Sequence, residues 1–179
     1  MHQSQWTTMA WLFGKYLSTS GVVYDIGSYD VNGSHKPQIL QRGLTYVGVD
    51  VLDGPNVDLV VEPYNWHPLP ENGCEYIISG SCLEHVEAPW MWAKEIARRL
   101  KPGGICIVLL PFYLTEHRYP VDCYRILPDG LKFLFVKWAG LECLECGITQ
   151  ENEDTYFVGI KKLPNKQKPD RIVTYIQLR

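Results

Sequence analysis

The sequence predicts an α/β fold, a doubly wound and mostly parallel sheet of seven strands with a C-terminal antiparallel hairpin. Short apolar strands alternate with amphipathic helices along most of the 179 residues, which is the pattern of parallel strands joined by helical crossovers. The segment 105–111 (ICIVLLP) is apolar throughout, as expected for a strand covered on both faces of the sheet. The last two strands follow each other through a short polar turn without a helix, which favours a hairpin.

The first part of the chain is expected to form two helices and three strands. Residues 4–18 carry large apolar side chains at helical spacing, and residues 37–43 predict a short helix that ends at a glycine. The segment 21–27 (GVVYDIG) contains β-branched and aromatic residues and predicts a strand, as does 44–50 (LTYVGVD). A third strand is expected at 57–62 (VDLVVE).

The second part continues the alternation. The segment 75–81 (EYIISGS) predicts a fourth strand. Residues 88–104 have helical spacing, with basic residues and then Pro-Gly-Gly at the end, which predicts a helix before the fifth strand. Residues 127–138 predict another helix, because a proline and an aspartate stand at its start.

The final hairpin consists of strands 140–149 and 154–163. It contains Cys143 and Cys146, a C-x-x-C pair. In a regular strand, residues three apart point to opposite faces, so we expect these thiols neither to bind one zinc ion nor to form a disulfide. A second C-x-x-C that would complete four ligands is missing from the sequence, and we predict no metal site.

Composition narrows the class of protein. The content of 46% hydrophobic and 21% charged residues is ordinary for a globular protein, and residues 1–163 are expected to form a single domain followed by a polar tail, 164–179. The net charge of −3 does not favour nucleic acid as a partner. The sequence has neither the pattern of a signal peptide nor an apolar run long enough for a membrane span, so we expect a cytoplasmic protein.

The end of the first strand is the most informative segment for function. The segment 23–34 (VYDIGSYDVNGS) lacks the glycine spacing of a dinucleotide-binding turn, and its acids Asp25 and Asp30 would repel a pyrophosphate. The second strand ends on Asp50, an acid that can accept hydrogen bonds from both hydroxyls of a ribose. An isolated acid at either position is often only turn chemistry. Together they favour a nucleoside that carries positive charge, for which S-adenosylmethionine is the obvious candidate.

Four segments then resemble the class I S-adenosylmethionine-dependent methyltransferases, most closely the small type 11 group. They are VYDIGSYDVNGS, YVGVDV, YIISGSCLEHVEAP and EIARRLKPGG, and the resemblance covers roughly residues 20–162. It implies a Rossmann-like methyltransferase fold and S-adenosylmethionine as the cofactor. The first motif departs from the family pattern, because Tyr29 and Asp30 stand where further glycines are usual.

The resemblance also implies, position by position, which residues would bind the cofactor. These are Asp25 and Gly27 at the methionine end, Asp50 at the ribose, Val51 at the adenine face, Glu62 or Tyr64 at the adenine edge, and Ser79 beside the methionine carboxylate and amine.

The acceptor chemistry is expected in the loop 112–125, which is polar and aromatic and follows a buried strand. We predict that His117 is the catalytic base and that Asp122 orients it, with His85 as the second candidate for the base. The alternatives are that Asp122 and Arg125 form a structural ion pair and that His85 is bonded to the backbone.

The sequence leaves the acceptor open. It lacks the Asn/Asp-Pro-Pro-Tyr motif usual in methyltransferases of amide or adenine amine groups, so we expect a small-molecule acceptor, with a hydroxyl favoured. The alternative is a catalytically silent S-adenosylmethionine-binding partner or scaffold protein. An oligomer or a partner subunit would be compatible with the short chain. The helix within residues 1–19 could fold over the cofactor as a lid or pack in the core.

Overall fold

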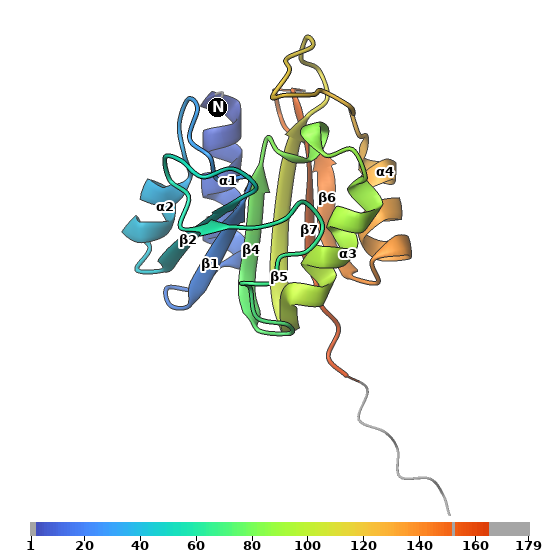
Figure 1. Cartoon of the computed structure of the whole chain (residues 1–179). Helices are drawn as coiled ribbons and strands as arrows, with labels where there is room; N and C mark the ends of the chain where they lie inside the picture. The colour runs from blue at the N-terminus through green and yellow to red at the C-terminus, as the bar shows by residue number, and fades with distance from the viewer. Residues whose placement is uncertain (1–2, 152, 165–179) are drawn as a thin grey trace, which may run out of the picture.

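The computed structural model describes residues 3–151 and 153–164, and within them a seven-stranded sheet forms the centre of the molecule (Figure 1). The strand order is β3-β2-β1-β4-β5-β7-β6. Strands β1 to β5 pair in parallel, whereas β7 is antiparallel to both β5 and β6. The strands are β1 (Val22–Ile26), β2 (Thr45–Asp50), β3 (Leu59–Val60), β4 (Cys74–Gly80), β5 (Leu100–Pro111), β6 (Glu142–Ile148) and β7 (Asp154–Ile160). The predicted fold class is confirmed.

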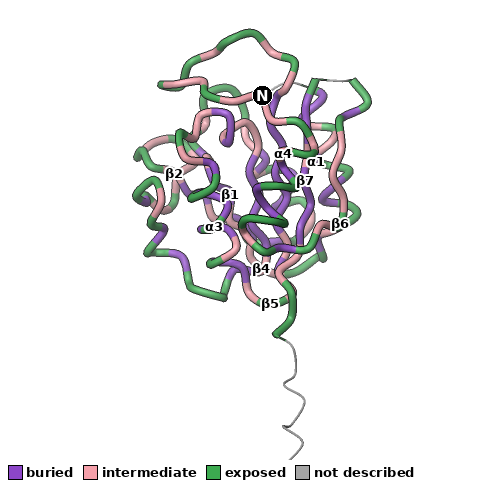
Figure 2. The backbone as a smooth tube through the Cα atoms, turned by 90° about the vertical axis from the view of Figure 1, so that its right-hand side faces the viewer, coloured by how far each residue is buried: buried purple, intermediate pink, exposed green. Residues whose placement is uncertain are grey.

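Helices cover both faces of the sheet. Helices α1 (Gln3–Tyr16) and α2 (Lys36–Gln41) pack on one face, and α3 (Pro89–Arg99) and α4 (Pro128–Lys132) pack on the other (Figure 1). Two apolar clusters result, one on each side of the strands, and the buried backbone in Figure 2 follows the sheet between them. None of the helices within residues 3–151 and 153–164 has the length and apolar character that crossing a bilayer requires.

The order of the strands places a ligand-binding position between β1 and β4. The chain builds outward from β1 through β2 to β3, and then returns to the other side of β1 to add β4 and β5. Such a reversal leaves a crevice at the carboxyl ends of the two central strands, where ligands of open α/β sheets bind. The carboxyl ends of β1, β2 and β4 therefore define the region to search for a site.

The predicted helix over 88–104 was wrong at its end. Helix α3 stops at Arg99, and β5 begins at Leu100, which has extended backbone (ψ 136°) and lies opposite Cys74 of β4. The Pro-Gly-Gly segment therefore lies inside the strand. Gly103 has φ +80°, and a Cβ on Gly104 would lie 2.8 Å from the carbonyl oxygen of Cys74. The two glycines permit this backbone within the strand. The same Pro-Gly-Gly pattern after basic residues is also typical of a helix end, so the sequence alone favoured the wrong element.

Two further boundaries differ from the sequence expectations. The third strand contains only Leu59 and Val60, and not the whole of 57–62. The helix expected over 127–138 consists of α4 and a π-helical segment, Phe133–Trp138, that continues it without a break.

The prediction that Cys143 and Cys146 point to opposite faces was also wrong. The register of β6 against β7 shifts between Cys143 and Glu145, so the strand contains an extra residue at a β-bulge. Both cysteines consequently pack against the apolar cluster on the α3 side of the sheet. All six cysteines are free in the structure.

Helix α1 packs on the sheet as part of the core. Met9, Leu12 and Phe13 are completely buried in the cluster on that face. Trp11 is half exposed and lies against Tyr156, away from the crevice. The side chains of Met9, Leu12 and Phe13 therefore belong to the core. Of the tail expected at 164–179, residues 165–179 lie outside the described residues.

Candidate functional site

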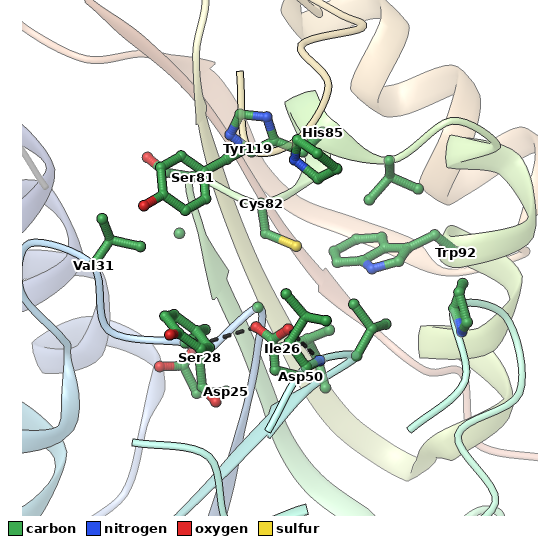
Figure 3. Close-up of a pocket in the computed structure, with 18 of the residues that line it drawn as sticks. Asp25, Ile26, Ser28, Val31, Asp50, Ser81, Cys82, His85, Trp92 and Tyr119 are labelled. Carbon is green, nitrogen blue, oxygen red and sulfur yellow. Dashed lines mark hydrogen bonds between the residues drawn. The ribbon is translucent and has the colours of Figure 1, made fainter. Parts of the chain in front are cut away.

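A cavity of about 720 Å³ opens at the carboxyl ends of β1, β2 and β4. Its size is within the range of about 300–1,000 Å³ that is common for small-molecule sites. Residues after the three strands form one side, and the loop between β5 and α4 covers the other. Figure 3 shows Asp25, Ser28 and Asp50 on one side of the cavity, with His85 and Tyr119 across from them.

Asp25 lies at the end of β1 and is almost completely buried. The hydroxyl of Tyr46 donates a hydrogen bond of 2.7 Å to its Oδ2, and the side-chain amide of Asn56 donates to the Tyr46 oxygen at 2.6 Å. Burial raises the pKa of Asp25 to about 7, with Tyr46 opposing the shift and the Asp50 carboxylate adding to it. A cationic ligand in the cavity would favour the ionised form of this carboxyl.

Gly27 forms the turn after β1, as the sequence predicts, and its backbone requires glycine. Its φ is +82°, and a Cβ there would lie 2.5 Å from the Cβ and Sγ of Cys82. The turn is held by hydrogen bonds from the amides of Gly27 and Ser28 to the carbonyl of Val49. Asp30, by contrast, does not line the cavity: its Oδ1 accepts the amide of Gly33 and closes a local turn.

We expect Gly27→Ala to lower the free energy of unfolding by about 2–5 kcal/mol, because it combines the strain of a left-handed backbone with a clash in a packed site. Gly140 is a matched control, since it also has φ +82° but nothing lies within 4 Å of its Cβ position. Gly140→Ala should therefore cost only the backbone part, about 1–2 kcal/mol. Urea unfolding of the two variants measures the difference, and equal losses would contradict the close contact with Cys82.

Asp50 ends β2 and faces the cavity beside Val51. Its Oδ2 accepts the amide of Tyr29 at 3.0 Å, and its Oδ1 accepts the amide of Leu52 at 3.1 Å. Each carboxylate oxygen has a second lone pair, so the group is fixed in position and can still accept hydrogen bonds from a ligand.

The structure places only one of the two residues predicted at the adenine edge, Glu62 and Tyr64, in the cavity wall. Tyr64 lines the cavity, and its hydroxyl accepts the backbone amide of Ala88 at 3.1 Å. Glu62 is exposed and lies outside the lining of the cavity, where it bridges to Asn65. Of the two residues expected at an adenine edge, the structure brings only Tyr64 to the site.

Ser79 does not line the cavity either. It is completely buried within β4, and its Oγ donates a hydrogen bond of 2.7 Å to the carbonyl of Ile26. Ser81 reaches the cavity instead, with a left-handed backbone (φ +52°) and a hydroxyl that donates to Gln5 of α1. The sequence pattern placed the strand correctly but could not show the left-handed backbone at Ser81, directly after the end of β4.

His35 also lines the cavity, and sequence reasoning missed it. Its ring lies against Trp6 and Phe13, with ring centroids 6.3 and 5.8 Å away, and burial lowers its pKa to about 4. The ring is packed so closely on Gly80 that a Cβ there would lie 2.7 Å from the Nε2 of His35. A lone histidine before a short helix gave no signal of this position.

Across the cavity, His85 and His117 lie side by side. Their ring centroids are 5.1 Å apart and the rings are nearly perpendicular. His85 belongs to the 3₁₀ turn Leu83–His85, and its Nδ1 lies 2.6 Å from the carbonyl of Val121. Burial lowers the pKa of His85. The loop that contains His117 is tied to this turn, because the amide of Cys123 donates to the carbonyl of Glu84.

Asp122 lies near His117 but is engaged elsewhere. Arg125 donates to both of its carboxylate oxygens, at 2.5 and 2.7 Å, and holds its pKa well below the usual range. Its Oδ2 also accepts the backbone amide of His117 at 2.7 Å, whereas the Nδ1 of the His117 ring is 3.5 Å away. The ion pair offered as the alternative is present, and Asp122 itself does not line the cavity.

Glu84 is the residue that sequence reasoning overlooked at this end. Its side chain is completely buried, directly behind the two histidines, and burial raises its pKa to about 8. Within the described part of the chain, neither of its carboxylate oxygens has a hydrogen-bond partner. An acid next to a histidine in a short turn appears in the sequence as an ordinary polar pair, so only the structure reveals its burial.

Comparisons with known proteins gave a family match and several solved structures with a similar fold. A family described as a methyltransferase domain matches residues 25–108. A search among curated proteins gave no match.

Several solved structures share the fold. A structure of the Haloferax volcanii Trm112 methyltransferase activator in complex with a methyltransferase matches with a TM-score of 0.69 and 16% identity, over 89% of this chain and 90% of that one. A Burkholderia thailandensis 1,6-didemethyltoxoflavin-N1-methyltransferase, with 1,6-didemethyltoxoflavin and S-adenosylhomocysteine bound, matches with a TM-score of 0.70 and 14% identity, over 90% and 79%. The [4+2]-cyclase SpnF matches with a TM-score of 0.68 and 15% identity, over 88% and 81%. At such identities the likeness establishes the fold.

Proposed function

Because the chain carries a methyltransferase domain of the type 11 family, we propose that it transfers a methyl group from S-adenosylmethionine to a hydroxyl of a small-molecule acceptor. The observation that carries this proposal is the cavity itself. It joins two acids at the ends of adjacent parallel strands, Asp25 and Asp50, to a pair of imidazoles on the opposite side. One end thus suits a cationic nucleoside, and the other suits a group that must lose a proton.

The residues of the first end fit the cofactor in shape and charge. Asp50 would bind the ribose hydroxyls, with Val51 and Tyr64 beside the base. Asp25 and the Gly27 turn would hold the methionine end, where the amine of the cofactor carries positive charge. When bound, S-adenosylmethionine supplies a methyl group that is already activated by the positive charge on its sulfur.

The chain's own residues then have two tasks, which are alignment and proton removal. The apolar walls that include Trp66 and Trp92 would exclude water and fix the acceptor. Alignment of the reactants can contribute about 7–11 kcal/mol at best. His117 and His85 lie side by side on the cavity wall and could receive the hydroxyl proton, which would add about 10²–10⁴ in rate.

Asp25→Asn tests the charge argument, because it keeps the shape of the side chain and an oxygen for Tyr46. The pKa of Asp25 is raised from 3.8 to about 7, so its carboxyl is mostly protonated well below pH 7 in the free protein, and a bound cation would favour its ionised form. We expect the affinity of the wild type for S-adenosylmethionine to rise with pH up to about 7. The variant should bind about tenfold more weakly at neutral pH and lose this pH dependence, as measured by calorimetric titration.

Asp30→Asn is the matched control for that experiment, since Asp30 lies in the same turn but caps Gly33 and does not line the cavity. Its affinity and pH dependence should equal those of the wild type. If Asp25→Asn instead gained affinity for NAD with no loss for S-adenosylmethionine, the role of Asp25 would be misassigned.

An assay with methyl-labelled S-adenosylmethionine tests the proposed function as a whole. The purified chain is incubated with fractionated small-molecule extracts, and the label should appear in a low-molecular-weight product with an ether methyl group. Label on nitrogen or carbon would overturn the hydroxyl assignment. Tight binding of the cofactor without any labelled product in the presence of all fractions would favour a silent binding or scaffold protein.

A further inference from the structure

Three side chains converge at the acceptor end of the cavity. The Nε2 atoms of His85 and His117 each lie 3.7 Å from Oε1 of Glu84. The ligand atoms of the three residues all lie within 4.8 Å of one another. Donor atoms bound to one metal ion at about 2.0–2.2 Å are separated by about 3–4 Å, so a small inward movement would complete such a site.

Glu84 is the group that most needs a partner. Its side chain is completely buried, and neither carboxylate oxygen has a hydrogen-bond partner among the described residues. A buried carboxyl group is costly to ionise unless it is paired with a cation or coordinates a metal ion. Arg125 donates to both oxygens of Asp122, whereas the two histidine rings each place Nε2 3.7 Å from Oε1 of Glu84.

The hydrogen bonds behind the histidines orient the Nε2 atoms toward Glu84. Nδ1 of His85 lies 2.6 Å from the carbonyl oxygen of Val121, so it carries the hydrogen and donates it. Nδ1 of His117 lies 3.2 Å from the carbonyl oxygen of Thr115 and 3.5 Å from both Oδ2 of Asp122 and Nη2 of Arg125. The nearest of these atoms, the Thr115 oxygen, is an acceptor and favours the same tautomer in that ring. Nε2 then has a free lone pair in both rings. A backbone carbonyl that accepts from the far nitrogen is the usual support of a metal-bound histidine.

We propose that Glu84, His85 and His117 bind one divalent transition-metal ion, such as Zn²⁺, Mn²⁺ or Fe²⁺, at the acceptor end of the cavity. Two imidazole nitrogens and one carboxylate oxygen form a donor set that these ions favour over Mg²⁺ or Ca²⁺, which prefer oxygen ligands alone. Three protein ligands leave coordination positions open, and both histidines line the cavity. The site is therefore accessible to a ligand from the cavity and backed by the buried carboxyl group of Glu84.

This site would deepen the proposed function, on which its role in the reaction rests. A hydroxyl that coordinates a divalent cation has a lowered pKa, so its proton can pass to solvent at neutral pH. With the ion bound, the two imidazoles act as ligands, and the cation takes over the activation of the acceptor. Metal binding itself requires neither the cofactor nor the acceptor and can be measured without them.

The test is a calorimetric titration of the full chain with Zn²⁺ after treatment with a chelator, followed by a Co²⁺ titration read from the visible absorption of the bound ion. We expect about one ion per chain and the absorption of a mixed nitrogen and oxygen environment. Glu84→Gln and His117→Ala should each weaken binding by at least tenfold. Glu84→Gln keeps the size of the side chain and removes its charge, and its thermal unfolding shows whether it folds.

Two variants serve as controls. His67→Ala removes an exposed histidine outside the cavity, and Cys123→Ser removes an exposed thiol near the site. Both should bind the ion as tightly as the wild type. The metal site would be overturned if the wild type did not bind the ion. It would also be overturned if Glu84→Gln and His117→Ala both bound the ion as tightly as the wild type. A chain that binds the ion but not S-adenosylmethionine would keep this inference and overturn the proposed function.

Discussion

Replacing Asp50 by alanine is expected to weaken the binding of S-adenosylmethionine by well over tenfold. The carboxylate would accept two hydrogen bonds from the ribose, each worth roughly 1.5–3 kcal/mol because the acceptor is charged. Its position is fixed by the amides of Tyr29 and Leu52, so it is preorganised before the ligand arrives. A loss of 1.4 kcal/mol corresponds to a tenfold change in affinity, and calorimetric titration measures it directly.

Asp53→Ala is the matched control, because Asp53 lies in the same loop, is exposed and does not line the cavity. It should bind the cofactor with unchanged affinity. Asp50→Ala removes the acceptor for two loop amides as well, so thermal unfolding is measured in parallel. If Asp50→Ala retained the affinity of the wild type, the assignment of this acid to the ribose would be wrong.

Replacing His117 by alanine is expected to reduce turnover by about 10²–10⁴ while the affinity for the cofactor stays within a fewfold. His117 lines the cavity, and its ring lies beside that of His85. The rate is followed as release of S-adenosylhomocysteine per folded molecule, with the acceptor fraction found in the labelling assay. His67→Ala, an exposed histidine outside the cavity, should keep the full rate.

Chelation separates the two ways in which His117 could act. If the imidazole itself accepts the proton, the wild type should keep its rate after a chelator removes divalent ions. If His117 acts as a metal ligand, the rate should fall and return on addition of Zn²⁺ or Mn²⁺, and His117→Ala should not be rescued. A lower melting temperature with an unchanged rate per folded molecule would assign only a structural role to His117.

Much of the fold could be predicted because hydrophobic periodicity is a local property. The apolar run 105–111 and the alternation before it defined a parallel sheet, and the last two strands defined its antiparallel end. The errors arose where tertiary contacts override local signals. Gly103 and Gly104 look like the end of a helix but bend a strand around the carbonyl of Cys74, and a bulge in β6 turns Cys143 and Cys146 to one face.

The candidate site was predictable in part for a similar reason. Asp25 and Asp50 end strands that pair side by side, so the strand pattern alone brought them to one edge of the sheet. Ser79 lies too deep in the strand, because its hydroxyl is bonded to the carbonyl of Ile26, and the cavity is lined by Gly80 and Ser81 after it. Glu84 could not be recognised as buried, since its environment is created by a loop more than thirty residues later in the chain.

Whether the cavity binds S-adenosylmethionine is measured by a calorimetric titration of the full chain with S-adenosylmethionine, S-adenosylhomocysteine and NAD. We expect the two S-adenosyl compounds to bind at one site per chain and to compete with each other, whereas NAD should produce no binding heat. S-adenosylmethionine should also protect the chain against thermal unfolding. Binding of NAD, or no binding of either S-adenosyl compound at millimolar concentration, would show that the cavity is not an S-adenosylmethionine site.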